Sequence, residues 1–459
     1  MSLLIRCCVF FSAVFLGVAK KYGMVSHSFP PDFLIGTASA AYQVEGGWNE
    51  GGKGESIWDH LVHTQPDVIN DKSNGDVACD SYHKYKEDVK LLKDIGVYRF
   101  SISWPRILPT GDTNVINQDG IKYYTNLINE LRSNNIIPMV KWWITINEPL
   151  EIVQGYSDKR YAPYLALNGV GDYLAGHTIL RAHAKAYHVY NEEFRAKQNG
   201  KVGITLNGNF FFPENNHAEN ITAAERAQQF EIGWFAHPIY SVTGDYPPIM
   251  RQSVDANSAK EDRSHSRLPR FSAEDKEMLK GSADFFGLNH YTSRKAYAGE
   301  IGGHPSHERD SNVIRTVDLH WETARVQWLK VVPEGLRGML NWVKNNYNNV
   351  PVFVTENGYA DNGQLKDNDR IHYFQTYISE MLKAVNEDKC NVIGYCAWSI
   401  LDNFEWLDGF SARFGIYHVD INDTERKRTP KKSVDFFKKM IKERKVVLDT
   451  RRELSNAIS

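Results

Sequence analysis

Several features that would assign this chain to other classes of protein are missing from its sequence. Lysine and arginine total 54 against 56 aspartates and glutamates, with no basic block, which excludes an electrostatic nucleic-acid interface. No His-Glu-x-x-His motif occurs, and the spacing of His177, His183 and His188 does not place them on one helical face. The glycines of residues 46–54 lack the following Lys-Ser/Thr of a phosphate-binding loop. We therefore expect no metal and no cofactor, and we expect residues 46–54 to shape the mouth of a pocket.

Long hydrophobic runs are also rare, and the one present lies near the N-terminus. Residues 7–19 are apolar, follow Arg6 and end at Ala19 before two lysines, and they are too few to cross a bilayer. This pattern is typical of a secretory signal peptide cleaved after Ala19. We expect residues 1–19 to be removed and the mature chain to be secreted without a membrane span. An uncleaved anchor is the alternative.

Cysteine is scarce in the part of the chain that would remain. Only Cys79, Cys390 and Cys396 follow the expected cleavage point, and three scattered cysteines predict no disulfide framework. Asn220 and Asn422 each begin an Asn-x-Thr triplet that can accept a glycan in the secretory pathway, although such triplets also occur by chance. We therefore expect a secreted glycoprotein without a set of disulfides.

Short runs of β-branched and aromatic residues alternate with helical patterns of apolar residues along most of the chain. This alternation predicts a parallel sheet, and 459 residues is a length that a single (β/α)8 barrel with long loops also reaches. Residues 244–270 are polar and are expected to form a loop. Strands are expected at residues 33–45, 98–104, 136–140, 141–147, 201–207, 283–291, 351–356 and 392–398, and helices at residues 81–95, 118–134, 172–196, 223–239, 333–346, 373–386 and 430–445.

The alternation breaks between the third and fourth expected strands. Residues 136–140 are followed at once by residues 141–147, whereas parallel neighbours need a crossover of at least about 10–12 residues. The two segments therefore cannot occupy adjacent parallel positions in one sheet. We expect an α/β barrel of the (β/α)8 type that is incomplete or distorted around strands three and four.

Two of the expected strands end in a glutamate of matching context. Thr-Ile-Asn-Glu-Pro at residues 145–149 and Val-Thr-Glu-Asn-Gly at residues 354–358 place Glu148 and Glu356 where buried strands stop. In parallel barrels, catalytic groups stand at the C-terminal ends of several strands, so the two carboxylates can share one pocket. A pair about 5–5.5 Å apart is the arrangement of a retaining glycosidase. Taken singly, each glutamate is more often a solvated loop residue.

Four segments together resemble the family-1 glycoside hydrolases, the β-glucosidases and their myrosinase-like and lactase-like relatives. They are the two glutamate motifs, residues 33–46 and residues 398–406, and the resemblance extends from about His27 to Lys445. It implies a glycosidase barrel over residues 27–446, preceded by the signal peptide of residues 1–19 and followed by a tail of residues 447–459.

The resemblance implies that Glu148 is the acid/base and Glu356 the nucleophile of a retaining β-glycosidase. The nucleophile must stay ionised, which the Arg99 guanidinium and the Tyr291 hydroxyl would favour. The acid must keep its proton near neutral pH, which apolar surroundings would favour.

The same resemblance implies a set of residues that bind the sugar. Gln43 and Glu405 offer amide and carboxylate atoms for a bidentate grip on hydroxyls, and Asn147 would bind the 2-hydroxyl. For each tryptophan of the set, core packing is an equal alternative. The implied set is Gln43, Asn147, Asn289, Tyr291, Trp398, Glu405, Trp406 and Phe414.

The chain departs from the family pattern at one place. Family members carry about 40 more residues between the positions of Val140 and Lys141, enough for one barrel unit, and this stretch brings a His-Trp pair that is absent here. Three hypotheses stay open: an active enzyme for terminal β-D-glucosyl groups, an inactive sugar-binding protein, and an unstable isoform. A myrosinase-type thioglucosidase is a further alternative. The expected partner is a small-molecule β-glycoside or oligosaccharide, and the oligomeric state stays open.

Overall fold

The computed structural model describes residues 24–136 and 141–449. The expected signal peptide and residues 137–140 of the expected third strand lie outside the described residues, as do residues 450–459 of the expected tail. Within the described part, the alternating strands and helices form the α/β architecture that the sequence predicts.

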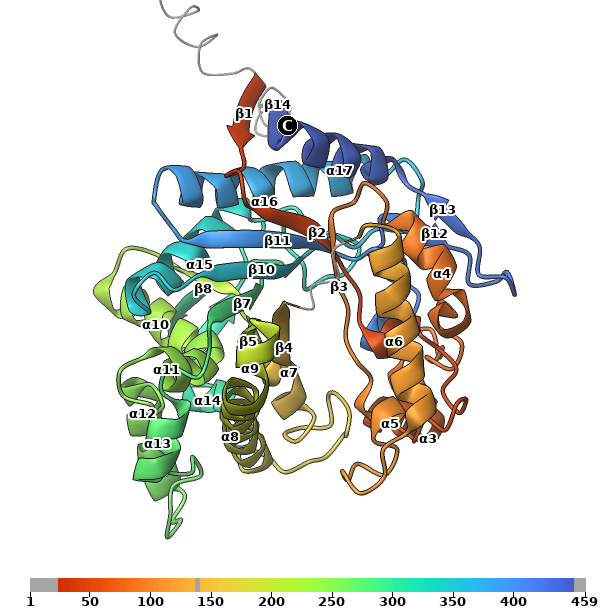
Figure 1. Cartoon of the computed structure of the whole chain (residues 1–459). Helices are drawn as coiled ribbons and strands as arrows, with labels where there is room; N and C mark the ends of the chain where they lie inside the picture. The colour runs from red at the N-terminus through yellow and green to blue at the C-terminus, as the bar shows by residue number, and fades with distance from the viewer. Residues whose placement is uncertain (1–23, 137–140, 450–459) are drawn as a thin grey trace, which may run out of the picture.

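A curved sheet of seven parallel strands lies at the centre of the molecule (Figure 1). Its order, β3-β2-β11-β10-β7-β5-β4, follows the order of the strands in the chain around a barrel. The middle strands are buried on both faces, which explains their nearly continuous apolar composition. The bounds are β2 Leu34–Ala38, β3 Val97–Arg99, β4 Trp142–Asn147, β5 Lys201–Asn207, β7 Phe285–Asn289, β10 Val352–Asn357 and β11 Val392–Trp398.

Helices follow most of these strands and form the outer layer of the fold (Figure 1). Each large helix buries an apolar stripe and exposes its polar face; on α15, for example, Leu336, Met339, Leu340 and Val343 face the core. Two predicted long helices are each divided by a π turn, at Tyr190–Phe194 and Gln229–Gly233. The large helices are α4 Ser81–Leu91, α6 Gln118–Ser133, α8 Gly171–Val189, α10 Ala218–Gln228, α11 Trp234–Tyr240, α15 Pro333–Asn346, α16 Asn368–Asn386 and α17 Lys432–Glu443.

The remaining strands and helices lie around the barrel. Antiparallel strands β1 and β14 join the two ends of the described chain, and the pairing includes Val447 and Leu448. The small strands are β1 Met24–Ser28 with β14 Lys445–Asp449, β6 Phe210–Pro213 with β8 Ser293–Ala298 and β9 Val313–Thr316, and β12 Tyr417–Val419 with β13 Arg428–Pro430. The other helices are α2 Ala41–Val44, α3 Ile57–Thr64, α5 Trp104–Ile107, α7 Pro149–Gln154, α9 Arg195–Gln198, α12 Pro248–Lys260, α13 Ala273–Leu279 and α14 His307–Asp310.

Three local predictions were wrong. The polar stretch 244–270 contains helix α12, which begins at Pro248 and buries Met250 and Val254; a proline at the first helical position and two apolar residues four apart are sufficient because tertiary packing supplies the rest. The first strand ends at Ala38 and turns into α2. The strand expected at residues 98–104 ends at Arg99, and its last residue begins α5.

The sheet is open on the side where the sequence lacks a crossover. β3 and β4 are its two edge strands, and no strand within residues 24–136 and 141–449 pairs with their outer sides. Every residue of β7 and β10 is buried, whereas every residue of β4 is partly or fully exposed. Trp104, just beyond β3, is 67% exposed. The prediction of an incomplete barrel around strands three and four is confirmed.

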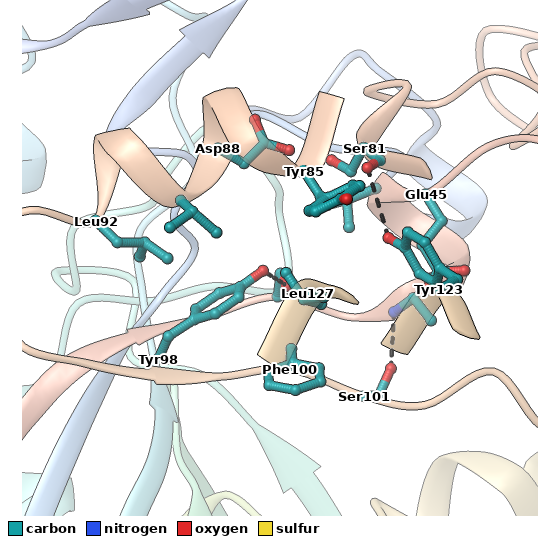
Figure 2. Close-up of a pocket in the computed structure, with 14 residues that line it drawn as sticks. Glu45, Ser81, Tyr85, Asp88, Leu92, Tyr98, Phe100, Ser101, Tyr123 and Leu127 are labelled. Carbon is teal, nitrogen blue, oxygen red and sulfur yellow. Dashed lines mark hydrogen bonds between the residues drawn. The ribbon is translucent and has the colours of Figure 1, made fainter. Parts of the chain in front are cut away.

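A small cavity lies between the sheet and two of its covering helices (Figure 2). Tyr98 and Phe100 face it from the end of β3, and residues of α4 and α6 close the other sides. Its volume is about 20 Å³, which is room for a single water molecule. The cavity is therefore a packing defect under the helices and is too small to accept a sugar.

The open edge predicts unequal protection of backbone amides. Alternate amides of β3 and β4 face no partner strand in the described chain, so we expect them to exchange with solvent about 100-fold faster than amides of β7 and β10. Hydrogen–deuterium exchange followed by mass spectrometry measures this difference. Equal protection across all four strands would mean that the sheet closes in solution.

Candidate active site

The register of the parallel strands brings four strand ends to one level. Glu356 of β10 pairs with Asn289 of β7, and Asn289 pairs in turn with Asn207 of β5. Asn147 of β4 pairs with Thr205 of β5, two residues before Asn207. The polar residues that end these strands therefore lie on the carboxyl edge of the sheet, where the ligands of parallel barrels bind.

Glu356 is held by two side chains, one at the end of β3 and one in the loop after β7. The Arg99 guanidinium at the end of β3 pairs with its Oε1 atom, and the Tyr291 hydroxyl donates to its Oε2 atom over 2.8 Å. Only 6% of the residue is exposed. Its carboxylate is thus oriented at both oxygens and faces a fixed positive charge.

Glu148 has a different environment. It occupies a left-handed conformation, φ 50°, between β4 and helix α7, and its Oε1 atom accepts a 2.8 Å hydrogen bond from the Asn289 amide. Burial, followed by the negative charges of Glu356 and Glu151, raises the pKa of Glu148 well above its ordinary value. The two carboxyls therefore differ as an acid and a nucleophile must differ: one faces a guanidinium and the other faces an amide.

A continuous hydrogen-bond network joins the two glutamates. Asn147 Oδ1 accepts from Arg99 Nη2 over 2.6 Å and from Asn289 Nδ2 over 3.2 Å. Arg99 also holds Glu356, and Asn289 also holds Glu148. Since Arg99 ends β3 and Asn147 ends β4, this network bridges the two open edges of the sheet at the level of the site.

Gln43, Trp398 and Glu405 form a second polar group at the same end of the sheet. Trp398 Nε1 donates to Glu405 Oε2 over 3.4 Å, and Gln43 Nε2 donates to Asn403 Oδ1 and to the Phe404 carbonyl, each over 2.9 Å. Burial raises the pKa of Glu405 to about 8, and the Glu356 charge adds to the rise. The electrostatic interaction between Glu405 and Glu356 indicates that the two polar groups lie near each other.

The remaining two predicted residues lie among aromatic rings. Trp406 is half-buried, with its ring centroid 4.7 Å from that of Trp58 and its plane 8° from that of Tyr42. Phe414 is buried with its ring nearly perpendicular to that of Tyr291, at a centroid distance of 6.0 Å. All eleven predicted site residues therefore lie on the carboxyl side of the sheet or in the loops that follow its strands.

The sequence alone did not reveal several residues that shape the site. Trp328 is 42% exposed and stacks over Phe414 at 19°. Asp71 accepts a hydrogen bond from the Phe410 amide over 2.6 Å, and Asn70 donates to Asp408 over 2.7 Å, so this distant loop fixes the loop that carries Glu405. The only local signal was an Asn-Asp pair in a polar stretch, which is common in ordinary turns.

No metal centre is assigned to these residues. Across residues 24–136 and 141–449, no group of three or more histidine, cysteine, aspartate or glutamate side chains could hold a metal ion. In the same part of the chain, no helix has the length and apolar character that crossing a membrane requires.

Taken together, a parallel α/β barrel with a glutamate pair at the ends of β4 and β10 is the architecture of a barrel glycoside hydrolase. The chain matches the family described as Glycosyl hydrolase family 1 over residues 25–141 and 139–446. It belongs to that family and is a β-glycosidase. The match divides at residues 139–141, which is where the crossover is missing.

Individual relatives agree with this assignment. The chain is 48% identical to Myrosinase 1 of Brevicoryne brassicae over 462 residues, which cover 91% of this chain and 99% of the relative. It is 38% identical to the cytosolic beta-glucosidase of Cavia porcellus over 467 residues, which cover 90% and 98%. The solved structure of an aphid myrosinase superposes with a TM-score of 0.87 at 48% identity, covering 91% of this chain and 99% of that one.

The raised pKa of Glu405 predicts that its carboxyl lowers stability at alkaline pH. The group is neutral in the fold up to about pH 8 but ionises near pH 4.5 when unfolded, so the folded state loses stability as pH rises through this window. We expect Glu405→Gln to stabilise the protein by about 4 kcal/mol at pH 8 and by little at pH 4.

Urea unfolding at the two pH values measures this effect. Glu55→Gln is a matched control, because it makes the same substitution at a side chain that is 52% exposed. An equal effect of Glu405→Gln at both pH values would contradict the raised pKa.

Proposed function

We propose that the protein is a retaining β-glycosidase that hydrolyses terminal β-D-glucosyl groups, with Glu356 as the nucleophile and Glu148 as the acid/base. The observation that supports this most strongly is the network from Glu356 through Arg99, Asn147 and Asn289 to Glu148. It fixes both carboxyls on one side of the sheet although one barrel strand is missing from the described chain.

In the first step, Glu356 attacks the anomeric carbon and forms a covalent bond to the sugar. Glu148 gives its proton to the leaving oxygen as the glycosidic bond breaks, so the aglycone departs as a neutral alcohol. Tyr291 and Arg99 hold the attacking carboxylate in place, which limits the motion that the attack requires.

In the second step, Glu148 acts as a base. It takes a proton from a water molecule whose oxygen attacks the anomeric carbon, and the bond to Glu356 breaks with return of the electron pair to the carboxylate. Two inversions at the same carbon leave the product in the β configuration. The raised pKa of Glu148 supports the first step because it favours the protonated form that an acid needs.

The sugar is bound by the second polar group and by Asn147. Glu405 accepts from sugar hydroxyls, while Gln43 and Trp398 supply N–H groups. The Oδ1 atom of Asn147 is occupied by Arg99 and Asn289, which leaves its amide nitrogen to donate to the 2-hydroxyl. Trp406 and Phe414 provide the apolar surface on which a sugar ring packs.

The stereochemistry of the product tests this mechanism. We expect the purified protein to release the aglycone of an aryl β-glucoside and to form β-glucose first, as observed by proton NMR before mutarotation. Glu356→Gln should lower kcat by at least about 10⁴-fold while the fold persists. Initial release of α-glucose, or turnover that survives Glu356→Gln, would refute the assignment.

A thioglucosidase activity is the second candidate, favoured by the 48% identity to a protein named Myrosinase 1. A thiolate leaves without a proton, whereas an alkoxide does not. Glu148→Gln should therefore spare the first step on a glucosinolate and abolish it on an alkyl β-glucoside. Comparing both substrates in the wild-type protein decides which activity dominates.

The open sheet edge favours a third possibility, a sugar-binding protein without activity. β4, which positions Asn147 and leads to Glu148, is exposed along its length, and a mobile strand would misplace the acid. Binding of a gluco-configured inhibitor by a cooperatively folding protein without turnover would establish this alternative. Absence of cooperative unfolding would instead identify an unstable isoform.

We also propose that the protein is secreted and carries a glycan at Asn422. Asn422 is exposed in the turn between β12 and β13. Asn220 is only 7% exposed; its amide donates to Asn215 over 2.9 Å, and its oxygen accepts from the Ala298 amide over 3.2 Å.

Expression through a secretory pathway tests this proposal. Peptide mass spectrometry should find a glycan at Asn422 and an unmodified Asn220, because the buried amide of Asn220 is engaged in the fold. Asn422→Gln should remove the mass shift of the protein on deglycosylation, and Asn220→Gln should not. Glycan at Asn220 would show that this side chain is accessible before folding is complete.

A further inference from the structure

A third carboxyl group, which the mechanism does not use, lies beside the acid/base. Glu151 is on the first turn of α7, three residues after Glu148. Asn207 Nδ2 donates to its Oε1 atom over 2.7 Å, and Gln154 Nε2 lies 3.3 Å from its Oε2 atom. The ion pairs within the described residues include none to Glu151, so its negative charge is not neutralised by direct contact.

Glu151 and Glu148 are held by adjacent asparagines of the same edge. Asn207 of β5 and Asn289 of β7 are paired in register; Asn289 donates to Glu148 and Asn207 donates to Glu151. The Oδ1 atom of Asn207 is buried and has no hydrogen-bond partner among the described residues. The two carboxyls are thus held by hydrogen bonds from asparagines of neighbouring strands.

We propose that Glu151 is a positioning residue that acts through Glu148, keeping the acid/base protonated to higher pH than the burial of Glu148 alone would achieve. This inference rests on the proposed function of the same site. A negative charge close to a buried carboxyl disfavours its ionisation.

The groups around Glu151 do not cancel the repulsion between its negative charge and that of an ionised Glu148. Burial raises the pKa of Glu151 to about 7, so the group gains its charge in the range where Glu148 must retain its proton. The positive charge of Arg160 opposes this rise in the pKa of Glu151, but Arg160 is also engaged by Asp158 and Glu308. The charged and titratable groups that interact with Glu151 from the surrounding elements are Glu148, Arg160, Tyr161, Glu231 and Glu308.

Glu151→Gln tests the proposal because it removes the charge and keeps an oxygen for the Asn207 amide. We expect the alkaline limb of the kcat/KM profile to shift to a pH about one unit lower. At pH values above this limb in both proteins, kcat/KM of the variant should then be about tenfold lower than that of the wild type. A loss that is equal at every pH would mean that Glu151 only supports the fold.

Two further variants separate charge from structure. Glu277→Gln removes the same charge from an exposed residue of α13 that takes no part in the site and should leave the alkaline limb unmoved. Glu151→Asp should restore the wild-type limb, and Glu151→Met, which is uncharged, should repeat the shift if Glu151→Gln does not fold. An alkaline limb that stays at the wild-type pH in a folded, uncharged variant overturns the proposal.

A binding measurement keeps the test independent of turnover. A gluco-configured imidazole places a nitrogen where the glycosidic oxygen would lie and accepts a hydrogen bond from protonated Glu148. Its affinity, followed through tryptophan fluorescence, should fall at a pH about one unit lower in Glu151→Gln than in the wild-type protein. A wild-type protein that binds this probe without hydrolysing glucosides would refute the proposed function and leave the effect of Glu151 measurable.

Discussion

The hydrogen bond between Arg99 and Asn147 is the contact on which the site depends. It joins the ends of β3 and β4, the two edges of a sheet that lacks a strand between them in the described chain. Elsewhere, each strand of the barrel is held by neighbours on both sides. At the open side, the Arg99 guanidinium holds the edge strands together only at their carboxyl ends, because it binds Glu356 and Asn147 at once. The catalytic end of the barrel is therefore bridged while the rest of the edge stays exposed.

The acidic groups at the carboxyl end of the sheet differ in the positive charge and hydrogen-bond donors that face them. Glu356 meets a guanidinium, whereas Glu148, Glu151 and Glu405 meet amide or indole donors and have raised pKa values because burial disfavours their charged forms. This imbalance is useful for chemistry because it gives the carboxyls of one site different electrostatic environments. It is costly for the fold, since each raised pKa lowers stability as pH increases.

The predicted bounds of strands and helices are most accurate where the apolar pattern of the sequence agrees with the burial of the side chains. Strands β5 and β11 and helix α15 have the bounds that the sequence predicts, because each is a run of buried residues with clear ends. Helix α12 was missed because its buried face consists of only a few residues in a polar stretch. The strand through Arg99 was made too long because residues 100–104 continue to alternate apolar and polar side chains after pairing stops. The sugar-binding residues came from the family resemblance, since Trp406 or Phe414 alone has the pattern of any core residue.

The sequence by itself determined the parallel alternation, the two glutamates at strand ends and the missing crossover after Val140, because these depend on local composition and on the length of chain that a return path requires. Only the tertiary structure decided that Arg99 reaches both Glu356 and Asn147, that Glu151 lies against Asn207, and that Asn220 is buried. These facts depend on the curvature of the sheet and on the burial of each group. Both arise from contacts between residues far apart in the chain, which no local pattern encodes.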